Sequence, residues 1–174
     1  MKKLRKNNRG VTLVELIVST AILAIVAVAA SAFMIAGTRT YSSVSYNVRL
    51  QYEAQIAMAQ LQEYTVDCTD GIAWDGSMLY IVNGNDVHLF KFDSAEQTLS
   101  YAKVLKADNL NESTISYDLA AEHITGMDVK LSKGQAEINL QMQRNTKTYS
   151  ATQIIAMRNR PVFETSWAEL KDKI

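Results

Sequence analysis

The chain has 174 residues, the size of one ordinary domain with an added terminal segment. Apolar residues make up 48% of the sequence, which is too many for a disordered chain. Five of the 18 basic residues lie in the first ten positions, so the remainder carries 13 basic and 18 acidic side chains, a net charge of −5. This mildly acidic exterior argues against a nucleic-acid partner, because phosphate binding needs a clustered basic face.

The first 36 residues carry the most informative pattern. A basic leader, residues 1–10, runs without a spacer into an apolar stretch, residues 11–36, that contains a single charged residue, Glu15. A carboxylate in hydrocarbon costs on the order of 3 kcal/mol, so this position requires a compensating interaction. A helix of about 20 residues spans a bilayer, and the cations of the leader predict that the N-terminus stays in the cytoplasm.

Two general interpretations of this segment are open. A secretory signal peptide would be removed after Ala27-Val28-Ala29 or Ala30-Ser31-Ala32, both of which satisfy the A-x-A rule. The apolar run is, however, longer than the roughly 7–15 residues of a signal-peptide core. An uncleaved membrane anchor would have suitable length and charge, but this interpretation gives no role to Gly10 or Glu15.

A third interpretation explains both residues. The string Gly10-Val11-Thr12-Leu13-Val14-Glu15, placed between a basic leader and a long apolar helix, resembles the processing motif of type IV prepilins and type II secretion pseudopilins. The resemblance implies that prepilin peptidase cuts between Gly10 and Val11 on the cytoplasmic side, and that Val11 is then N-methylated. It also implies that Glu15 faces the terminal amine of a neighbouring subunit in the assembled filament. Val11 stands where the family most often has phenylalanine.

The resemblance predicts a function as well as a processing site. It implies a structural subunit, minor in kind, of a type IV pilus or a type II secretion pseudopilus. Its partners would be other pilin-like subunits and an inner-membrane assembly platform. The protein would cross the inner membrane once, with lipid around the helix and the globular domain outside, before it enters a filament. The alternative is a membrane-anchored extracytoplasmic binding module that joins no filament; a mature N-terminus at Val11 would favour the first function and an intact leader the second.

The helical pattern continues beyond the membrane segment. No proline or glycine interrupts residues 38–66, so one helix is predicted over residues 11–66, with a length of roughly 80 Å. Its second half is amphipathic and has two candidate apolar faces. The first face consists of Val44, Val48, Tyr52 and Ile56, and the second of Leu50, Ala54, Ala57, Met58, Leu61 and Tyr64. We expect the first face to be buried against a β-sheet.

From Gly71 onward the apolar pattern has a period of two, which is typical of strands. Asn83-Gly84-Asn85-Asp86 and Lys133-Gly134 are turn signals that each predict a hairpin. Strands are expected at residues 78–82, 87–92, 98–105, 115–119, 127–132 and 136–143, and the helix is expected to cover the face with Val129, Leu131, Ile138 and Leu140. Residues 149–157 fit either a strand or a short helix. The predicted fold class is therefore α+β, a long N-terminal helix packed on an antiparallel sheet, as in pilins.

The sequence divides into five segments: the leader (1–10), the membrane and assembly half of the helix (11–36), its amphipathic half (37–66), a β-rich domain (67–161) and a C-terminal tail (162–174). The tail carries Trp167, Leu170 and Ile174 at helical spacing, so it either docks on the core or frays. The order of a strand pair, a polar segment and a terminal Arg158-Asn159 resembles the order found in the minor pseudopilins. A fragment that begins near Tyr41 is expected to fold alone as a monomer.

No enzyme motif is present in the sequence, so the protein is not expected to be an enzyme. Cys68 is the only cysteine, which excludes an intramolecular disulfide, and we expect a buried, inert thiol. Two oxygen-rich groups could in principle hold Ca²⁺, although a plain turn is the simpler interpretation of each: Asn83, Asn85 and Asp86, and separately Asp108, Asn109, Asn111 and Glu112. Neither a metal nor another cofactor is expected.

Overall fold

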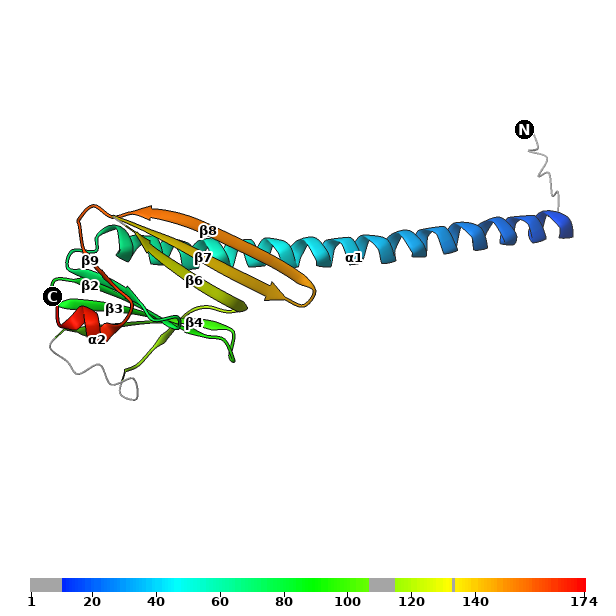
Figure 1. Ribbon diagram of the computed structural model, residues 1–174. Helices are drawn as coiled ribbons and strands as arrows, with labels where there is room; N and C mark the ends of the chain where they lie inside the picture. Colours follow the sequence, from blue (N-terminus) through cyan, green and yellow to red (C-terminus); the bar gives the residue numbers. More distant parts are fainter. Residues whose placement is uncertain (1–10, 107–114, 133) are drawn as a thin grey trace, which may run out of the picture. The chain divides into compact units, whose positions relative to one another are not determined.

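The computed structural model describes residues 11–106, 115–132 and 134–174. These residues form a long helix, α1 (Leu13–Val66), nine β-strands and a short C-terminal helix, α2 (Trp167–Lys171) (Figure 1). The chain divides into two compact units, Met1–Val44 and Ser45–Ile174, so the two halves of α1 belong to different units. The α+β class and the single long helix predicted from the sequence are confirmed.

The second unit contains two separate sheets. The larger sheet has the strand order β5-β4-β3-β2-β1-β9, and the smaller one has the order β6-β7-β8. The strands of the larger sheet are β1 (Gly71–Trp74), β2 (Met78–Asn83), β3 (Asp86–Asp93), β4 (Thr98–Leu105), β5 (Asp118–Ala121) and β9 (Val162–Glu164). Those of the smaller sheet are β6 (Ile124–Ser132), β7 (Gln135–Arg144) and β8 (Lys147–Ala156). All pairings are antiparallel except that of β1 with β9.

The predicted hairpins are present, and short turns set their registers. Gly84, with a φ of 61°, lies between β2 and β3 at the predicted turn, where a left-handed backbone favours glycine. Of the two alternatives for residues 149–157, the strand is correct up to Ala156, because β8 pairs with β7 along its whole length. The sequence did not predict β1, and it did not predict that the strands divide into two sheets.

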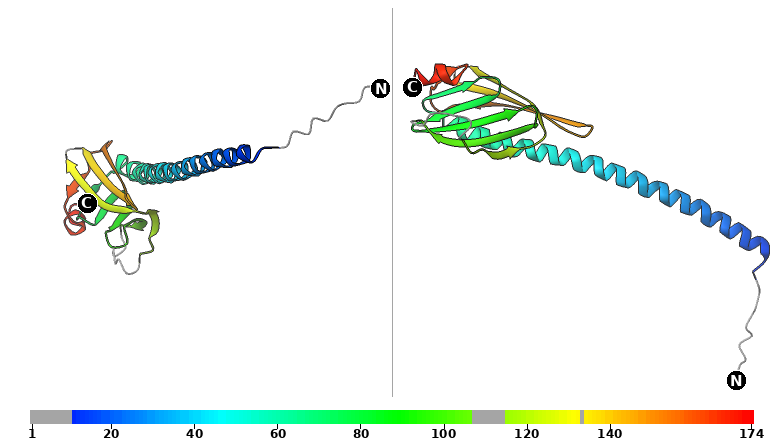
Figure 2. Two further views of the ribbon diagram at one scale, coloured as in Figure 1. Left: turned by 90° about the vertical axis from the view of Figure 1, so that its right-hand side faces the viewer. Right: turned by 90° about the horizontal axis from the view of Figure 1, so that it is seen from below.

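Both faces of the larger sheet are buried, which explains the continuous apolar run in β2. Leu79 and Ile81 point into a core between this sheet, the smaller sheet and the second half of α1. Met78, Tyr80 and Val82 point into a second core on the opposite face, which includes Leu170 of α2. A strand covered on both faces has no wet side, so it loses the alternation that half-exposed strands show. Figure 2 draws most strands of the larger sheet in green and those of the smaller sheet in yellow to orange, as two separate sheets.

The buried face of α1 differs from the predicted one. Its buried residues are Leu50, Ala54, Ala57, Met58, Leu61 and Thr65. This is the second of the two candidate faces with Thr65 in place of Tyr64, which is only partly buried against the core. The first face is exposed: Val44 is 54%, Val48 56%, Tyr52 64% and Ile56 39% accessible. The predicted sheet surface is largely correct, since Val129, Ile138 and Leu140 are buried in the same core as Leu61 and Leu131 packs against it.

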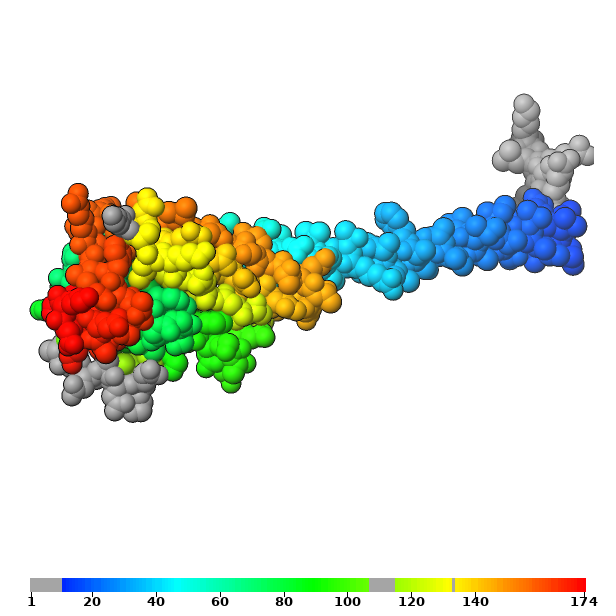
Figure 3. All heavy atoms as spheres, viewed as in Figure 1, coloured from blue at the N-terminus to red at the C-terminus, as the bar shows by residue number. Residues whose placement is uncertain are grey.

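The C-terminal residues dock on the domain instead of fraying. Strand β9 adds to the larger sheet beside β1, and Leu170 of α2 is fully buried on that sheet. In Figure 3 the C-terminal residues (red) lie against the rest of the domain. Ser166 caps α2 by accepting a hydrogen bond from the backbone N–H of Glu169. Gly71 permits the close approach of α2, because a Cβ at this position would collide with the Leu170 side chain.

The end of α1 is fixed by residues just before β9. The backbone N–H of Arg158 donates to the carbonyl of Val66 at 3.0 Å, and its guanidinium lies 2.8 Å from the carboxylate of Asp67. The amide of Asn159 donates to the Cys68 carbonyl at 3.1 Å. Arg158 and Asn159 therefore attach the segment between β8 and β9 to the end of α1, which positions β9 beside β1.

Candidate membrane and assembly site

Helix α1 begins at a defined cap. The backbone N–H of Leu16 donates to the Thr12 carbonyl at 3.1 Å, and the N–H of Glu15 donates to the Thr12 hydroxyl at 3.2 Å. Thr12 is thus the N-cap and Glu15 is the third helical residue, the spacing of a capping box. The Thr12–Glu15 spacing is the signal in the sequence from which this cap could have been predicted. The cap uses the backbone of Glu15, so the carboxylate is left for another interaction.

The apolar residues that follow are exposed all around the helix. An 18-residue window of α1 has a mean hydropathy of 2.5, with none of its residues buried. Leu13 is 75%, Leu23 68% and Phe33 82% accessible to solvent. Such a helix is long and apolar enough to cross a membrane. A continuous apolar surface of this size requires lipid or other protein around it.

Hydroxyl groups in this apolar helix are paired within the helix itself. Ser19 donates to the carbonyl of Glu15 at 2.6 Å, Ser31 to that of Ala27 at 2.8 Å, and Thr40 to that of Ala36 at 3.0 Å. Hydrogen bonds of this kind satisfy Ser and Thr in hydrocarbon, where water is absent. These residues therefore need no external partner.

Glu15 differs from these hydroxyl residues. Its side chain lies in the first turn of α1, and within residues 11–106, 115–132 and 134–174 it has no ion-pair partner. The carboxylate gains a modest stabilisation from the helix N-terminus, typically about 0.3–1 kcal/mol. That is less than the roughly 3 kcal/mol that a carboxylate costs at the centre of a bilayer.

The predicted cleavage site is only partly described. Val11 directly precedes the N-cap and is 69% accessible, whereas Gly10 and the basic leader lie outside the described residues. Four positions separate Val11 from Glu15, which is about one helical turn. An amine at Val11 and the Glu15 carboxylate would both lie at the start of α1.

The remaining candidates have structural roles. Cys68 is buried and its Sγ contacts the Gly71 carbonyl at 3.2 Å. Burial raises the pKa of the Cys68 thiol to about 12, which keeps it protonated and unreactive. Asp86 pairs with Lys103 at 2.7 Å, and Asn83 accepts a hydrogen bond from the Thr69 backbone at 3.1 Å. The described residues contain no cluster of metal-binding side chains; the other oxygen-rich group, residues 108–112, lies outside them.

An aromatic cluster that the sequence did not predict lies at the edge of the larger core. The Tyr64 ring stacks on His88 at 4.2 Å and on Tyr101 at 5.2 Å, and His88 Nδ1 lies 2.9 Å from the Tyr101 hydroxyl. Burial lowers the pKa of His88 and raises that of Tyr101, so both side chains are uncharged near neutral pH. The cluster joins α1 to β3 and β4, and no signal in the sequence brings these three residues together.

Comparison with known proteins identifies the N-terminal segment. Residues 5–31 match the family model described as the prokaryotic N-terminal methylation motif. No curated protein and no solved structure matches the chain. The matched segment contains the start of α1, its cap and Glu15, so the comparison and the geometry point to the same part of the molecule.

Proposed function

We propose that this chain, which carries the prepilin leader of type IV pilins and pseudopilins, is a minor structural subunit of a type IV pilus or a type II secretion pseudopilus. One observation carries the proposal. The methylation motif continues into an exposed apolar segment of α1 whose hydroxyls are paired internally. The one carboxylate of this segment up to residue 36, Glu15, has no ion-pair partner within the part of the chain that the structure describes. Such a helix fits assembly with similar helices.

The motif indicates a prepilin-type precursor that is processed by prepilin peptidase. We place the cut between Gly10 and Val11, where a residue without a side chain gives a protease access to the backbone. Cleavage removes the cations of the leader and creates an amine at Val11, which we propose as the site of N-methylation. The amine, methylated or not, remains a cation at neutral pH.

We assign Glu15 to subunit assembly. A carboxylate paired with an ammonium in a low-dielectric environment is far less costly than either charge alone. The Val11 amine of a neighbouring subunit provides that charge, and it exists only after cleavage. The pair would therefore fix the register between helices, a role that buried polar groups have in coiled coils.

The remaining assignments follow from this role. Residues 11–36 would span the inner membrane with the N-terminus in the cytoplasm, as the basic leader indicates. Residues 37–66 and the β-rich remainder would lie outside. Other pilin-like subunits and an inner-membrane assembly platform would be the partners. The motif belongs to a family of structural subunits, which supports a role without catalysis.

Glu15→Gln tests this proposal most sharply. Glutamine keeps the size of the side chain and is compatible with a capping box, and the cap itself uses the Glu15 backbone N–H. We expect Glu15→Gln to be cleaved normally in the host but to enter filaments at least about a hundredfold less, because removal of one partner from a buried ion pair costs about 3–5 kcal/mol. Ser19→Ala is the matched control, since its hydroxyl bonds only within the helix, and it should assemble as wild type does. If Glu15→Gln assembled like wild type, the carboxylate would have no role in assembly.

A further inference from the structure

Strand β8 is an open sheet edge that lacks the usual protection. Among the residues that the structure describes, it pairs with β7 alone, and it keeps an unbroken register over ten residues. The other described edges are short or irregular: β9 has three residues, β5 has four and a register shift beside it, and β6 has a register shift near Gly126. Natural edges are blunted by charges, proline, bulges or short length. In β8 the only charge is Lys147, at its start.

The hydrogen bonds at the two ends of β7 show which backbone groups of β8 face outward. The N–H of Gln143 donates to the His123 carbonyl at 2.9 Å, away from its partner Thr148. The N–H of Met157 donates to the Gly134 carbonyl at 2.9 Å, on the β7 side. Because residues in a ladder alternate in direction, the odd-numbered residues of β8 face β7. The N–H and C=O groups of Thr148, Ser150, Thr152 and Ile154 therefore face the open edge.

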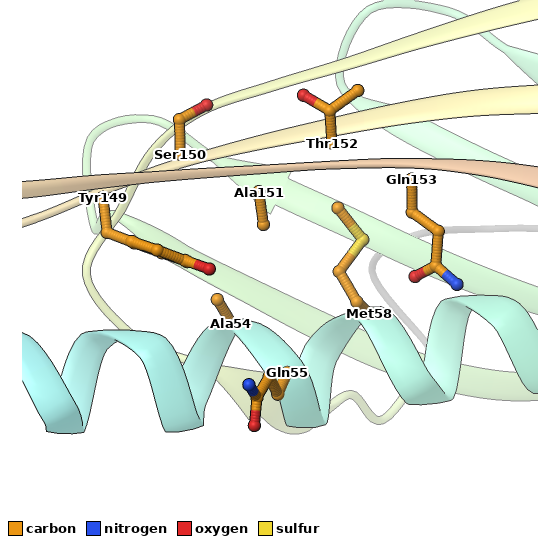
Figure 4. Close-up of a pocket in the computed structure, with 8 residues that line it drawn as sticks. All are labelled: Ala54, Gln55, Met58, Tyr149, Ser150, Ala151, Thr152 and Gln153. Atoms are coloured by element: carbon orange, nitrogen blue, oxygen red, sulfur yellow. The ribbon is translucent and has the colours of Figure 1, made fainter.

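A cavity of about 370 Å³ lies beside this edge, between β8 and α1 (Figure 4). It is lined by residues 149–153 of β8 and by Ala54, Gln55 and Met58 of α1. Side chains alternate between the faces of a strand, so five consecutive residues can border one cavity only where the cavity runs along the strand edge. Figure 4 shows Tyr149, Ala151 and Gln153 pointing toward α1 and Ser150 and Thr152 pointing away. None of the lining side chains is charged.

The flank of α1 next to the cavity carries two exposed apolar side chains. Tyr52 and Val48 precede Gln55 by three and seven residues, which places them on the same flank of the helix. Their exposed fractions are 64% and 56%. These are two of the residues that the sequence assigned to the buried face. A strand added beside β8 would lie about 4.8 Å farther out, over this flank.

We propose that the open edge of β8 binds an extended segment of another protein as an added β-strand, and that this segment is apolar and uncharged on the face that it turns toward α1. The four outward-facing residues of β8 provide the main-chain hydrogen bonds. Alternate side chains of the bound segment enter the cavity and cover Val48 and Tyr52, which selects segments that are apolar on one face. The uncharged lining disfavours acidic or basic side chains at those positions. This surface lies in the second unit and is independent of cleavage and of Glu15.

A synthetic peptide with the sequence of β7, Gln135–Arg144, is a suitable probe because this sequence forms a strand in the protein and is apolar on one face. Its binding to the full-length protein in lipid nanodiscs can be followed by fluorescence anisotropy, with empty nanodiscs as the blank. We expect saturable binding. A second peptide is N-methylated at alternate residues, those whose N–H groups would donate to the open edge of β8. It should bind at least about tenfold more weakly than the unmodified peptide, because it lacks these hydrogen-bond donors.

Thr152→Pro is the decisive variant. Its N–H faces the open edge, where proline is tolerated, and the substitution should weaken peptide binding about tenfold or more, whereas Thr152→Val should bind as wild type does. Hydrogen exchange should slow at Ser150, Thr152 and Ile154 when the peptide binds. The proposal fails if the wild-type protein does not bind the peptide. It also fails if the N-methylated peptide binds as tightly as the unmodified one, or if Thr152→Pro binds the peptide as tightly as wild type does. Slower hydrogen exchange at odd-numbered amides of β8 alone would also contradict it, because it would indicate that the peptide displaces β7. Cleavage after Gly10 should be the same in both variants, so a failure here leaves the assembly role untouched.

Discussion

The packing of α1 on the sheets can be tested by removing one aliphatic side chain from each of its two apolar faces. Leu61 is fully buried in the core between the two sheets, and Ile56, five residues earlier, is 39% accessible. A fully buried Leu→Ala change typically costs about 2–5 kcal/mol through lost burial and the cavity that remains. Ile56→Ala loses less burial and gains roughly 0.4 kcal/mol of helix propensity, so its net cost should be below about 1 kcal/mol.

The assay is urea unfolding of a fragment that begins at Tyr41, followed by far-UV circular dichroism. With an m-value of about 1.5 kcal/mol per molar urea, a cost of about 3 kcal/mol lowers the midpoint for Leu61→Ala by about 2 M. The midpoint for Ile56→Ala should fall by less than about 0.7 M. If Ile56→Ala were the more damaging change, or if the two midpoints were equal, the assignment of the buried face would be wrong.

Two further predictions concern Cys68 and Gly10. Burial raises the Cys68 pKa from an ordinary 9.0 to about 12, so the folded state holds the thiol proton more tightly than the unfolded chain does. The resulting contribution to the free energy of unfolding is complete below pH 9 and is lost as the pH rises toward 12, by about 1.4 kcal/mol per pH unit. In urea titrations from pH 8 to pH 11, Cys68→Ala should remove this part of the decrease in stability with pH. An identical decrease in both proteins would contradict the prediction. Gly10→Val should leave full-length precursor in the membrane on immunoblots, and normal amounts of the mature form would refute the assigned cleavage site.

The error in the buried face of α1 has a geometric cause. Residues spaced by four drift about 40° around a helix at each step, so a row from Val44 to Ile56 turns through about 120° and cannot face one sheet. Leu50, Ala54, Ala57 and Leu61 follow the i, i+4, i+7, i+11 pattern and stay on one line. The small side chains of Ala54 and Ala57 are weak hydrophobic signals in a sequence, yet they allow the sheets to approach the helix.

Other elements differ in how local their signals are. The β2–β3 hairpin and the β6–β7 pair could be predicted because a turn signal and regular alternation lie within a few residues. Strand β9 has three residues and pairs in parallel with a strand 91 positions earlier, so no local sequence pattern predicts it. The open edge of β8 could not be predicted from the sequence either, because strand order depends on contacts between residues that are distant in the sequence. The motif around Glu15 is local, which is why the N-terminal segment could be interpreted from the sequence alone.

The mature N-terminus tests the central claim most directly. The protein should be purified from membranes of its host, and its intact mass and N-terminal peptide should be determined by mass spectrometry. We predict a chain that begins at Val11, carries one added methyl group on its amine and lacks all ten residues of the leader. A chain that keeps the leader, or one that begins after Ala29 or Ala32, would contradict the proposal that this protein is processed and assembled as a pilin-like subunit.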